Sequence, residues 1–256
     1  MNAALKSLLR RYLPRRVTSH RILSGSLRGQ RIFTSWHDYP AAILGYTERP
    51  LLAWFARCVQ TSDTWLDVGA HYGYTAIALS RLVGESGRAF AFEPTVRTAG
   101  YLSETRQINV LPQLSVLPLA LGAAESLEVK RLPVTRGMVD SGIDRGEWEE
   151  TLLVASLDWL WPRICGERKR IHGVKVDVQG MEIDVLRGMA DMLREHRPKL
   201  VVEVHRGVSR PGLLSLIESL GYGRHPEPIE PVEGEVGAQY IDDRSYAFEP
   251  VSERRA

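Results

Sequence analysis

Short apolar runs and helix-like segments alternate along the chain from residue 64 onward. The strand-like runs are Thr64–Val68, Arg88–Phe92, Leu114–Leu119, Val174–Val178 and Leu200–Val204. None of them alternates cleanly between apolar and polar positions, which is typical of strands covered on both faces. In the segments between them, apolar residues recur three and four positions apart, as on one face of a helix. This alternation predicts an α/β fold with a doubly wound, mostly parallel sheet.

Capping signals place the ends of two helices. Thr47 is expected to cap a helix with Pro50 in its first turn, and Ser209 to cap a helix that ends before Gly221. Another helical face is formed by Val185, Leu186, Met189, Met192 and Leu193.

Two segments do not follow this rhythm. Between about residues 123 and 157, a strand-like run at Ser126–Leu132 is followed by a polar loop over 133–150. After residue 222 the chain is rich in Pro and Gly, and we expect strand-like runs at Gln239–Ile241 and Ser245–Phe248 to form an antiparallel C-terminal edge.

The N-terminal segment is basic, with eight Lys and Arg residues before the first acidic residue, Asp38. Residues 3–13 have the spacing of a short amphipathic helix that Pro14 ends. Such a helix either contacts an anionic membrane surface or a partner, or packs on its own domain. We divide the chain into a basic N-terminal arm and lead-in, residues 1–45, and a larger domain, residues 46–256.

The composition limits the function classes. With 256 residues, 44% hydrophobic and 25% charged, the chain is neither disordered nor collagen-like. Its two cysteines and seven scattered histidines give no disulfide framework and no zinc-ligand spacing. No apolar run approaches the roughly 20 residues of a membrane span, and the N-terminus lacks a secretory signal. We therefore expect a cytoplasmic protein, with contact to a membrane periphery left open for the basic arm.

A glycine-containing turn follows the first strand of the alternation and reads DVGAHYGYT over residues 67–75. The next strand ends at Glu93, whose carboxylate can accept hydrogen bonds from both hydroxyls of a ribose. Because parallel strands end at the same edge of the sheet, the turn and Glu93 predict a nucleoside-binding site. A dinucleotide turn reads G-x-G-x-x-G, but here His71 stands at its second glycine and impedes a pyrophosphate. The spacing suits S-adenosylmethionine, which has no phosphate.

Four motifs resemble those of FkbM-type methyltransferases: DVGAHYGYTA, AFEP, VKVDVQGMEIDVLRGM and LVVEVH. The resemblance covers about residues 43–248, including Gly45-Tyr46-Thr47-Glu48, and is most specific from Lys175 to Gly188. One departure is Gln179, where the family often has Glu, so we assign residue 179 no acid or base role. The resemblance implies a Rossmann-like class I methyltransferase that uses S-adenosylmethionine, and many such enzymes methylate hydroxyl groups.

The resemblance also implies the cofactor contacts. They are Asp67, Gly69, Ala70, Gly73, Thr75, Glu93, Leu119, Ala120 and Leu121. The turn residues would line the methionine moiety above Asp67, Glu93 would hold the ribose, and backbone at 119–121 would border the adenine. Thr75 would either cap the following helix or contact the ligand.

Candidate catalytic residues stand at the ends of the fourth and fifth strands: Lys175, Asp177, Glu203 and His205. Methyl transfer to a hydroxyl needs in-line positioning and gains from a general base. We expect Asp177 or His205 to be the base or to orient the hydroxyl, with Glu203 nearby. A structural alternative is an ion pair between Lys175 and Glu203. Asp177, Glu203 and His205 could hold a metal for a catechol-like acceptor, but the transfer requires none and we expect none.

Irregular segments are expected to select the acceptor: residues 20–46, 133–150 and 206–212. The second of these carries Arg136, Asp140, Ser141, Asp144, Arg145 and Trp148, which suit a polyhydroxyl ligand. We expect the acceptor to be a hydroxyl of a glycan, glycolipid or secondary metabolite, and we expect no nucleic acid because the net charge is only +2. The alternatives are a nicotinamide-dependent oxidoreductase and a non-catalytic binding protein with the same fold.

Overall fold

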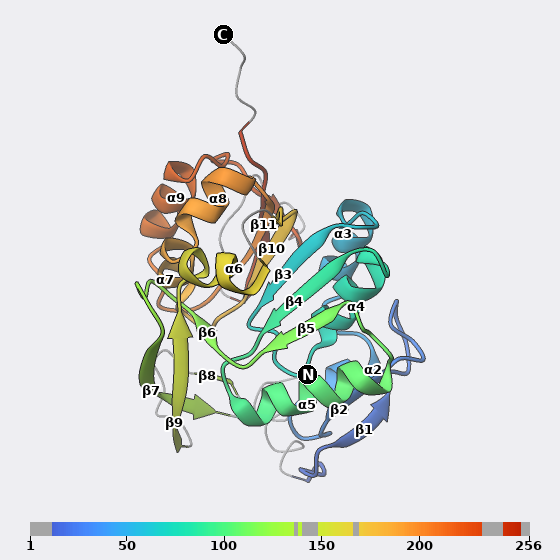
Figure 1. Cartoon of the computed structure of the whole chain (residues 1–256). Helices are drawn as coiled ribbons and strands as arrows, with labels where there is room; N and C mark the ends of the chain where they lie inside the picture. Colours follow the sequence, from blue (N-terminus) through green and yellow to red (C-terminus); the bar gives the residue numbers. More distant parts are fainter. Residues whose placement is uncertain (1–11, 136–137, 140–147, 166–168, 232–242, 252–256) are drawn as a thin grey trace.

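A seven-stranded sheet forms the centre of the protein (Figure 1). The computed structural model describes residues 12–135, 138–139, 148–165, 169–231 and 243–251. The strands lie in the order β5(Leu114–Leu117), β4(Arg88–Phe92), β3(Thr64–Val68), β10(Gly173–Val176), β11(Lys199–Val204), β13(Arg244–Phe248) and β12(Glu227–Pro228). The first five are mutually parallel, whereas β13 pairs antiparallel with both of its neighbours. The predicted doubly wound sheet with an antiparallel edge is confirmed.

The order of the strands reverses between β3 and β10. From β3 the chain proceeds outward to β4 and β5, and later returns on the other side of β3 to build β10 and β11. The last register pairs are Val68 with Phe92, Val68 with Val176, and Val176 with Val202. The residues that come next are Glu93 after β4, Gly69 after β3, Asp177 after β10 and Glu203 in β11. These four residues therefore form one row across the carboxyl edge, where open parallel sheets bind their ligands.

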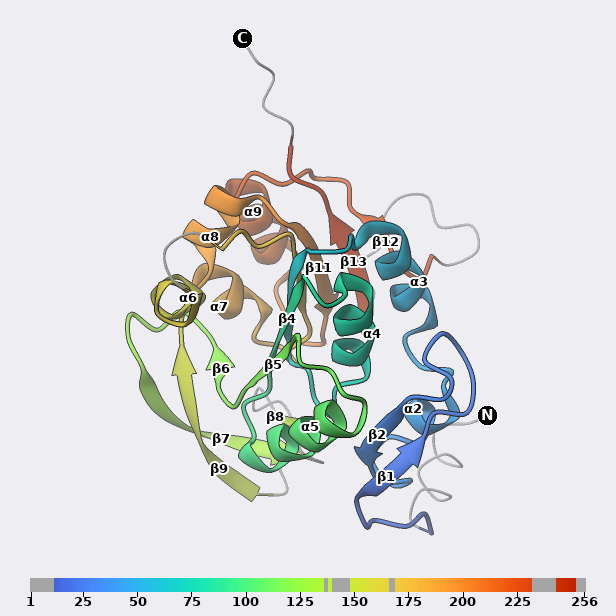
Figure 2. The same cartoon turned by 45° about the vertical axis from the view of Figure 1, so that its right-hand side comes forward.

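Helices cover both faces of the sheet, as Figure 2 shows. One face carries α6(Leu157–Cys165), α7(Glu182–Arg187), α8(Ala190–His196) and α9(Arg210–Ser219), and the opposite side carries α3(Arg49–Cys58), α4(Tyr74–Val83) and α5(Val96–Ile108). Successive strand residues alternate between the two cores: Leu66 and Val68 pack toward the first, and Trp65 toward the second. All three side chains are buried, which explains the continuous apolar runs.

Several local predictions differ from the structure. Within the segment predicted as a polar loop over 133–150, residues 133–135 instead belong to β7(Glu128–Thr135) and residues 148–150 to β9(Trp148–Ala155), and these two strands pair antiparallel. In the same second sheet, β6(Ala120–Leu121) pairs parallel with β9, and β8(Met138–Val139) pairs antiparallel with β7. Of the residues expected to select the acceptor in this segment, Trp148 begins β9. The others lie outside the described residues, as does the run Gln239–Ile241: they are Arg136, Asp140, Ser141, Asp144 and Arg145. The helical face from 185 to 193 is split into α7 and α8 at Gly188, where an added Cβ would stand 1.8 Å from the carbonyl oxygen of Gly122.

Two helix caps were predicted, and one of them is wrong. Helix α3 follows Glu48, not Thr47, with no side-chain cap bond. The cap of α9 is confirmed, because the Ser209 side chain accepts a hydrogen bond from the backbone N–H of Gly212.

The lead-in segment forms a hairpin and a short helix before the main sheet. Strands β1(Thr18–Arg21) and β2(Arg31–Thr34) pair antiparallel, and α2(Pro40–Leu44) follows them. The backbone N–H of Phe33 donates to Thr105 Oγ1, which ties the hairpin to α5 (Figure 1). The helix predicted over residues 3–13 lies almost wholly outside the described residues. Among those that are described, no helix has the length and apolar character to cross a membrane.

Candidate active site

A cavity of about 360 Å³ opens at the carboxyl edge of the central sheet. This volume lies within the range of small-molecule sites, about 300–1,000 Å³. Its wall contains most of the predicted residues: Gly69, Ala70, Thr75, Glu93, Leu119, Ala120, Leu121, Lys175, Asp177 and Glu203. Asp67, Gly73 and His205 are not wall residues, but each is bonded to one of them. The predicted residues thus converge on one cavity and on a layer directly behind it.

The turn after β3 requires glycine for backbone reasons. Gly69 has a φ of +83°, and an added Cβ would lie 1.8 Å from the carbonyl oxygen of Asp177. His71 also adopts a left-handed conformation, with φ +48°, and its ring packs 4.2 Å from that of Tyr72 and 5.5 Å from that of Tyr39. The His71 side chain forms part of the cavity wall at the position where a dinucleotide turn has its second glycine.

Glu93 presents a buried carboxylate to the cavity, with the residue only 3% exposed. It accepts hydrogen bonds from the backbone N–H of His71 (3.0 Å), the N–H of Thr95 (3.0 Å) and the Thr95 hydroxyl (2.7 Å). Burial raises the pKa of Glu93 to about 7, although these three hydrogen bonds lower it. A carboxylate offers about four acceptor positions, so capacity remains for a ligand. This fixed acceptor beside the apolar wall of Phe92, Leu119 and Leu121 fits an adenosine group.

A buried charge network lies beneath the turn. Lys175 Nζ stands 3.3 Å from Asp67 Oδ1 and 3.0 Å from Asp177 Oδ2. Lys175 therefore pairs with these two aspartates and not with Glu203. Thr75 Oγ1 donates to Asp67 Oδ2 at 2.7 Å, and the start of α4 has no side-chain cap, so the capping alternative for Thr75 is wrong.

The network fixes the protonation of Lys175 and Asp177. Burial would lower the pKa of Lys175, but the charges of Asp177 and Asp67 raise it well above its usual value. Burial would raise the pKa of Asp177, yet Lys175 holds it below its usual range. Both groups therefore stay charged at neutral pH.

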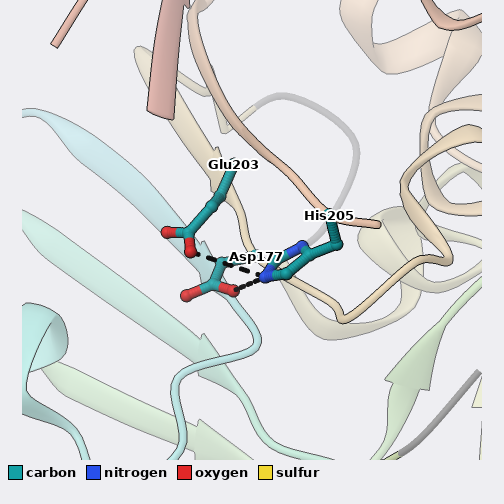
Figure 3. Close-up of side chains that lie close together, drawn as sticks. All are labelled: Asp177, Glu203 and His205. Atoms are coloured by element: carbon teal, nitrogen blue, oxygen red, sulfur yellow. Dashed lines mark ion pairs between the residues drawn. The ribbon is translucent and has the colours of Figure 1, made fainter. Parts of the chain in front are cut away.

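His205 faces two wall carboxylates with the same ring nitrogen, as Figure 3 shows. Its Nε2 stands 3.4 Å from Asp177 Oδ1 and 3.4 Å from Glu203 Oε1. On the other side of the ring, Nδ1 donates to Glu182 Oε1 at 2.6 Å, and Glu182 is completely buried. Burial would lower the pKa of His205, but the hydrogen bonds to Glu182 and Glu203 raise it to about 10. In this arrangement the imidazole carries a proton at neutral pH.

Glu203 and Glu48 are two further wall carboxylates whose pKa values are raised. Burial and the negative charge of Asp177 raise the pKa of Glu203. Burial and the charge of Glu203 raise the pKa of Glu48 to about 7. A carboxylate whose pKa lies near neutrality accepts a proton more readily than an ordinary one.

Sequence reasoning missed what the lead-in, and Glu48 just after it, contribute to this cavity. Asp38, Tyr39 and Glu48 line its wall together with the strand-end residues. Glu48 has a φ of +53°, a conformation that a non-glycine side chain rarely adopts and that often marks a functional site. The signal for Glu48 was its place in the Gly45–Glu48 motif, and no periodic pattern marks the other two.

The strand order and the cavity at its switch point define the class I methyltransferase fold. Residues 67–223, more than half of the chain, match the methyltransferase FkbM domain, and the chain belongs to that family. No curated protein matches the sequence.

Solved structures share the fold. Methyltransferase FkbM from Methylobacillus flagellatus KT is 16% identical, with a TM-score of 0.50 over 77% of this chain and 50% of that one, so this chain spans about half its length. A putative rRNA-methylase from Clostridium thermocellum is 11% identical, with a TM-score of 0.51 over 79% of this chain and 94% of that one. At identities this low, the structural similarity shows a common fold and nothing more.

Proposed function

We propose that the protein transfers a methyl group from S-adenosylmethionine to a hydroxyl of a small acceptor, of the glycan, glycolipid or secondary-metabolite kind. The observation that carries this proposal is the row formed by Glu93, Gly69, Asp177 and Glu203 along one cavity. It combines a fixed ribose acceptor, a backbone turn and two carboxylates facing one space. Membership of the FkbM family supports methyl transfer over hydride transfer.

The cofactor half of the cavity is assigned as follows. Glu93 accepts hydrogen bonds from the ribose hydroxyls, and the turn at Gly69 and Ala70 borders the methionine moiety. The apolar wall at 119–121 borders the adenine. When bound, the cofactor supplies a methyl group that its sulfonium has already activated.

The acceptor half is assigned to the carboxylates. Asp177, which Lys175 keeps ionised, accepts a hydrogen bond from a second hydroxyl of the acceptor and so orients the molecule. Glu203, whose pKa is raised, takes the proton as the oxygen attacks. Lys175 and His205 are protonated and hold these carboxylates in place, so they act as positioning residues.

A panel of hydroxylated acceptors, incubated with isotopically labelled S-adenosylmethionine and analysed by mass spectrometry, tests the proposal. We expect label on a hydroxyl oxygen and none on the matching deoxy compound. Glu203→Gln should lower turnover by about 100-fold or more while the affinity for the cofactor changes little. Glu227→Gln, which alters an exposed pair with Arg57, is the matched control. Label that appears on amine acceptors instead of hydroxyls would contradict the assignment.

A further inference from the structure

Three potential metal ligands meet at the acceptor side of the cavity. One ligand atom each of Asp177, Glu203 and His205 lies within 4.8 Å of the other two. Ligand atoms about 2.1 Å from one cation, at octahedral or tetrahedral angles, stand roughly 3.0–3.4 Å apart. The two distances from His205 Nε2, 3.4 Å to each carboxylate, are already at the upper end of this range. A common ion would take the place of the contact that the Gln179 side-chain nitrogen makes with His205 Nε2 at 2.9 Å, and the three ligand atoms would close around it (Figure 3).

Each of the three side chains is held by an atom that does not face the others. Asp177 is held through Oδ2 by Lys175, and Glu203 through Oε2 by the Ser245 hydroxyl at 3.4 Å. His205 is held through Nδ1 by Glu182. A metal-binding histidine almost always donates its other N–H to such an outer partner, which fixes the ring and raises its basicity. This outer layer turns Asp177 Oδ1, Glu203 Oε1 and His205 Nε2 toward one point.

The charge around that point is negative. Asp67, Asp177, Glu182 and Glu203 are buried or partly buried there, against the cations Lys175 and His205. Glu48 adds a further carboxylate to the same wall. A divalent cation would relieve this excess, because opposite charge stabilises buried carboxylates.

We infer that Asp177, Glu203 and His205 form a binding site for a divalent cation, of the Mn²⁺ or Fe²⁺ type that mixed imidazole and carboxylate ligands suit. From the sequence we expected no metal, because methyl transfer requires none. Asp177 and Glu203 also line the cavity, so an ion held by them would be open to the acceptor.

The inference deepens the proposed function and rests on it for the acceptor. An ion with open positions binds two neighbouring oxygens of one molecule. The site therefore favours acceptors with adjacent oxygens, such as a vicinal diol or a hydroxy acid, and a cation there lowers the pKa of the hydroxyl.

Titration of the full chain with MnCl₂, after removal of metal by a chelator, tests the inference. Binding is followed by the paramagnetic resonance of free Mn²⁺ and by calorimetry, without acceptor. We expect one saturable site. Asp177→Asn and Glu203→Gln should each weaken it by more than about 10-fold, and Glu182→Gln by about 10-fold, because the outer partner of His205 then carries no charge. The matched control is Asp38→Asn, another wall carboxylate that is hydrogen-bonded to Ser35 and Tyr72, and it should bind like the wild type.

Absence of saturable binding up to millimolar Mn²⁺ would overturn the inference, as would equal binding by wild type and the ligand variants. Thermal unfolding identifies any variant that fails to fold, and each of the two carboxylate variants tests the site independently. A parallel titration with S-adenosylmethionine separates the two proposals. Cofactor binding without Mn²⁺ binding refutes the metal site alone, whereas Mn²⁺ binding without cofactor binding supports the metal site and contradicts the proposed function.

Discussion

Replacement of Lys175 by methionine removes a cation from the buried network below the cavity. Lys175 is 2% exposed and Asp67 is 1% exposed, with the two charged groups 3.3 Å apart. Asp177 lies 3.0 Å from the same ammonium group. Methionine matches the length of the lysine stem, so the main effect of the change is to remove the cation that Asp67 and Asp177 share, with His205 still 3.4 Å from Asp177.

Removal of one partner from a buried ion pair costs about 3–5 kcal/mol, because the other charge stays buried and uncompensated. Since domains are stable by about 5–15 kcal/mol, Lys175→Met should lower the free energy of unfolding by a large fraction. Urea denaturation at pH 7.5 measures this loss. The additional change Asp67→Asn removes one of the stranded charges and should recover part of the stability. Acidification toward pH 5 should also shrink the difference from wild type, because the stranded carboxylates then take up protons.

The matched control is Lys130→Met. Lys130 forms an exposed pair with Glu128 at 3.3 Å, and exposed pairs contribute only about 0–1 kcal/mol. A loss below about 1 kcal/mol in Lys175→Met, close to that of the control, would refute the structural importance of the network. A double variant no more stable than Lys175→Met would refute the charge-based explanation.

Two further predictions concern residues of the cofactor side. The pKa of Glu93 is raised from 4.5 to about 7 in the folded protein, so stability present below pH 4.5 is lost as the pH rises to 7. In Glu93→Gln, the free energy of unfolding measured with urea should fall less between pH 4.5 and 7 than in the wild type. An equal fall in both proteins would contradict a pKa of Glu93 raised by burial. Gly69→Ala should cost more than about 2 kcal/mol, because its Cβ would meet the Asp177 carbonyl. Gly100→Ala, inside α5 with no atom within 4 Å of the added Cβ, should raise the free energy of unfolding by up to about 1 kcal/mol. Equal changes of the melting temperature in the two alanine variants would contradict this difference.

The central sheet could be predicted because its strands are buried on both faces. Runs such as Thr64–Val68 and Arg88–Phe92 are continuous and apolar, and the structure has strands at the same bounds. The row of strand-end residues follows from the same reasoning, since parallel strands end at one edge. Strand β9 was not predicted because its polar start at Glu149 and Glu150 resembles a loop. Its backbone hydrogen bonds with β7 stabilise it as a strand.

Properties of the site that depend on tertiary packing could not be predicted. Glu182 comes next to His205 only through the packing of α7 beside the end of β11, and this contact raises the pKa of His205. The wall positions of Tyr39 and Glu48 arise because the end of the lead-in and the residues just after it lie over the strand ends. No periodic pattern in the sequence encodes either arrangement.

Calorimetric titration of the purified protein with S-adenosylmethionine tests the nucleoside-binding site most directly. We predict saturable binding by the wild type and at least about 10-fold weaker binding by Glu93→Ala, because hydrogen bonds to a charged group contribute about 1.5–3 kcal/mol each. Absence of saturation, or equal affinity of the two proteins, would contradict the assignment of Glu93 and of the turn at Gly69 to an adenosine cofactor.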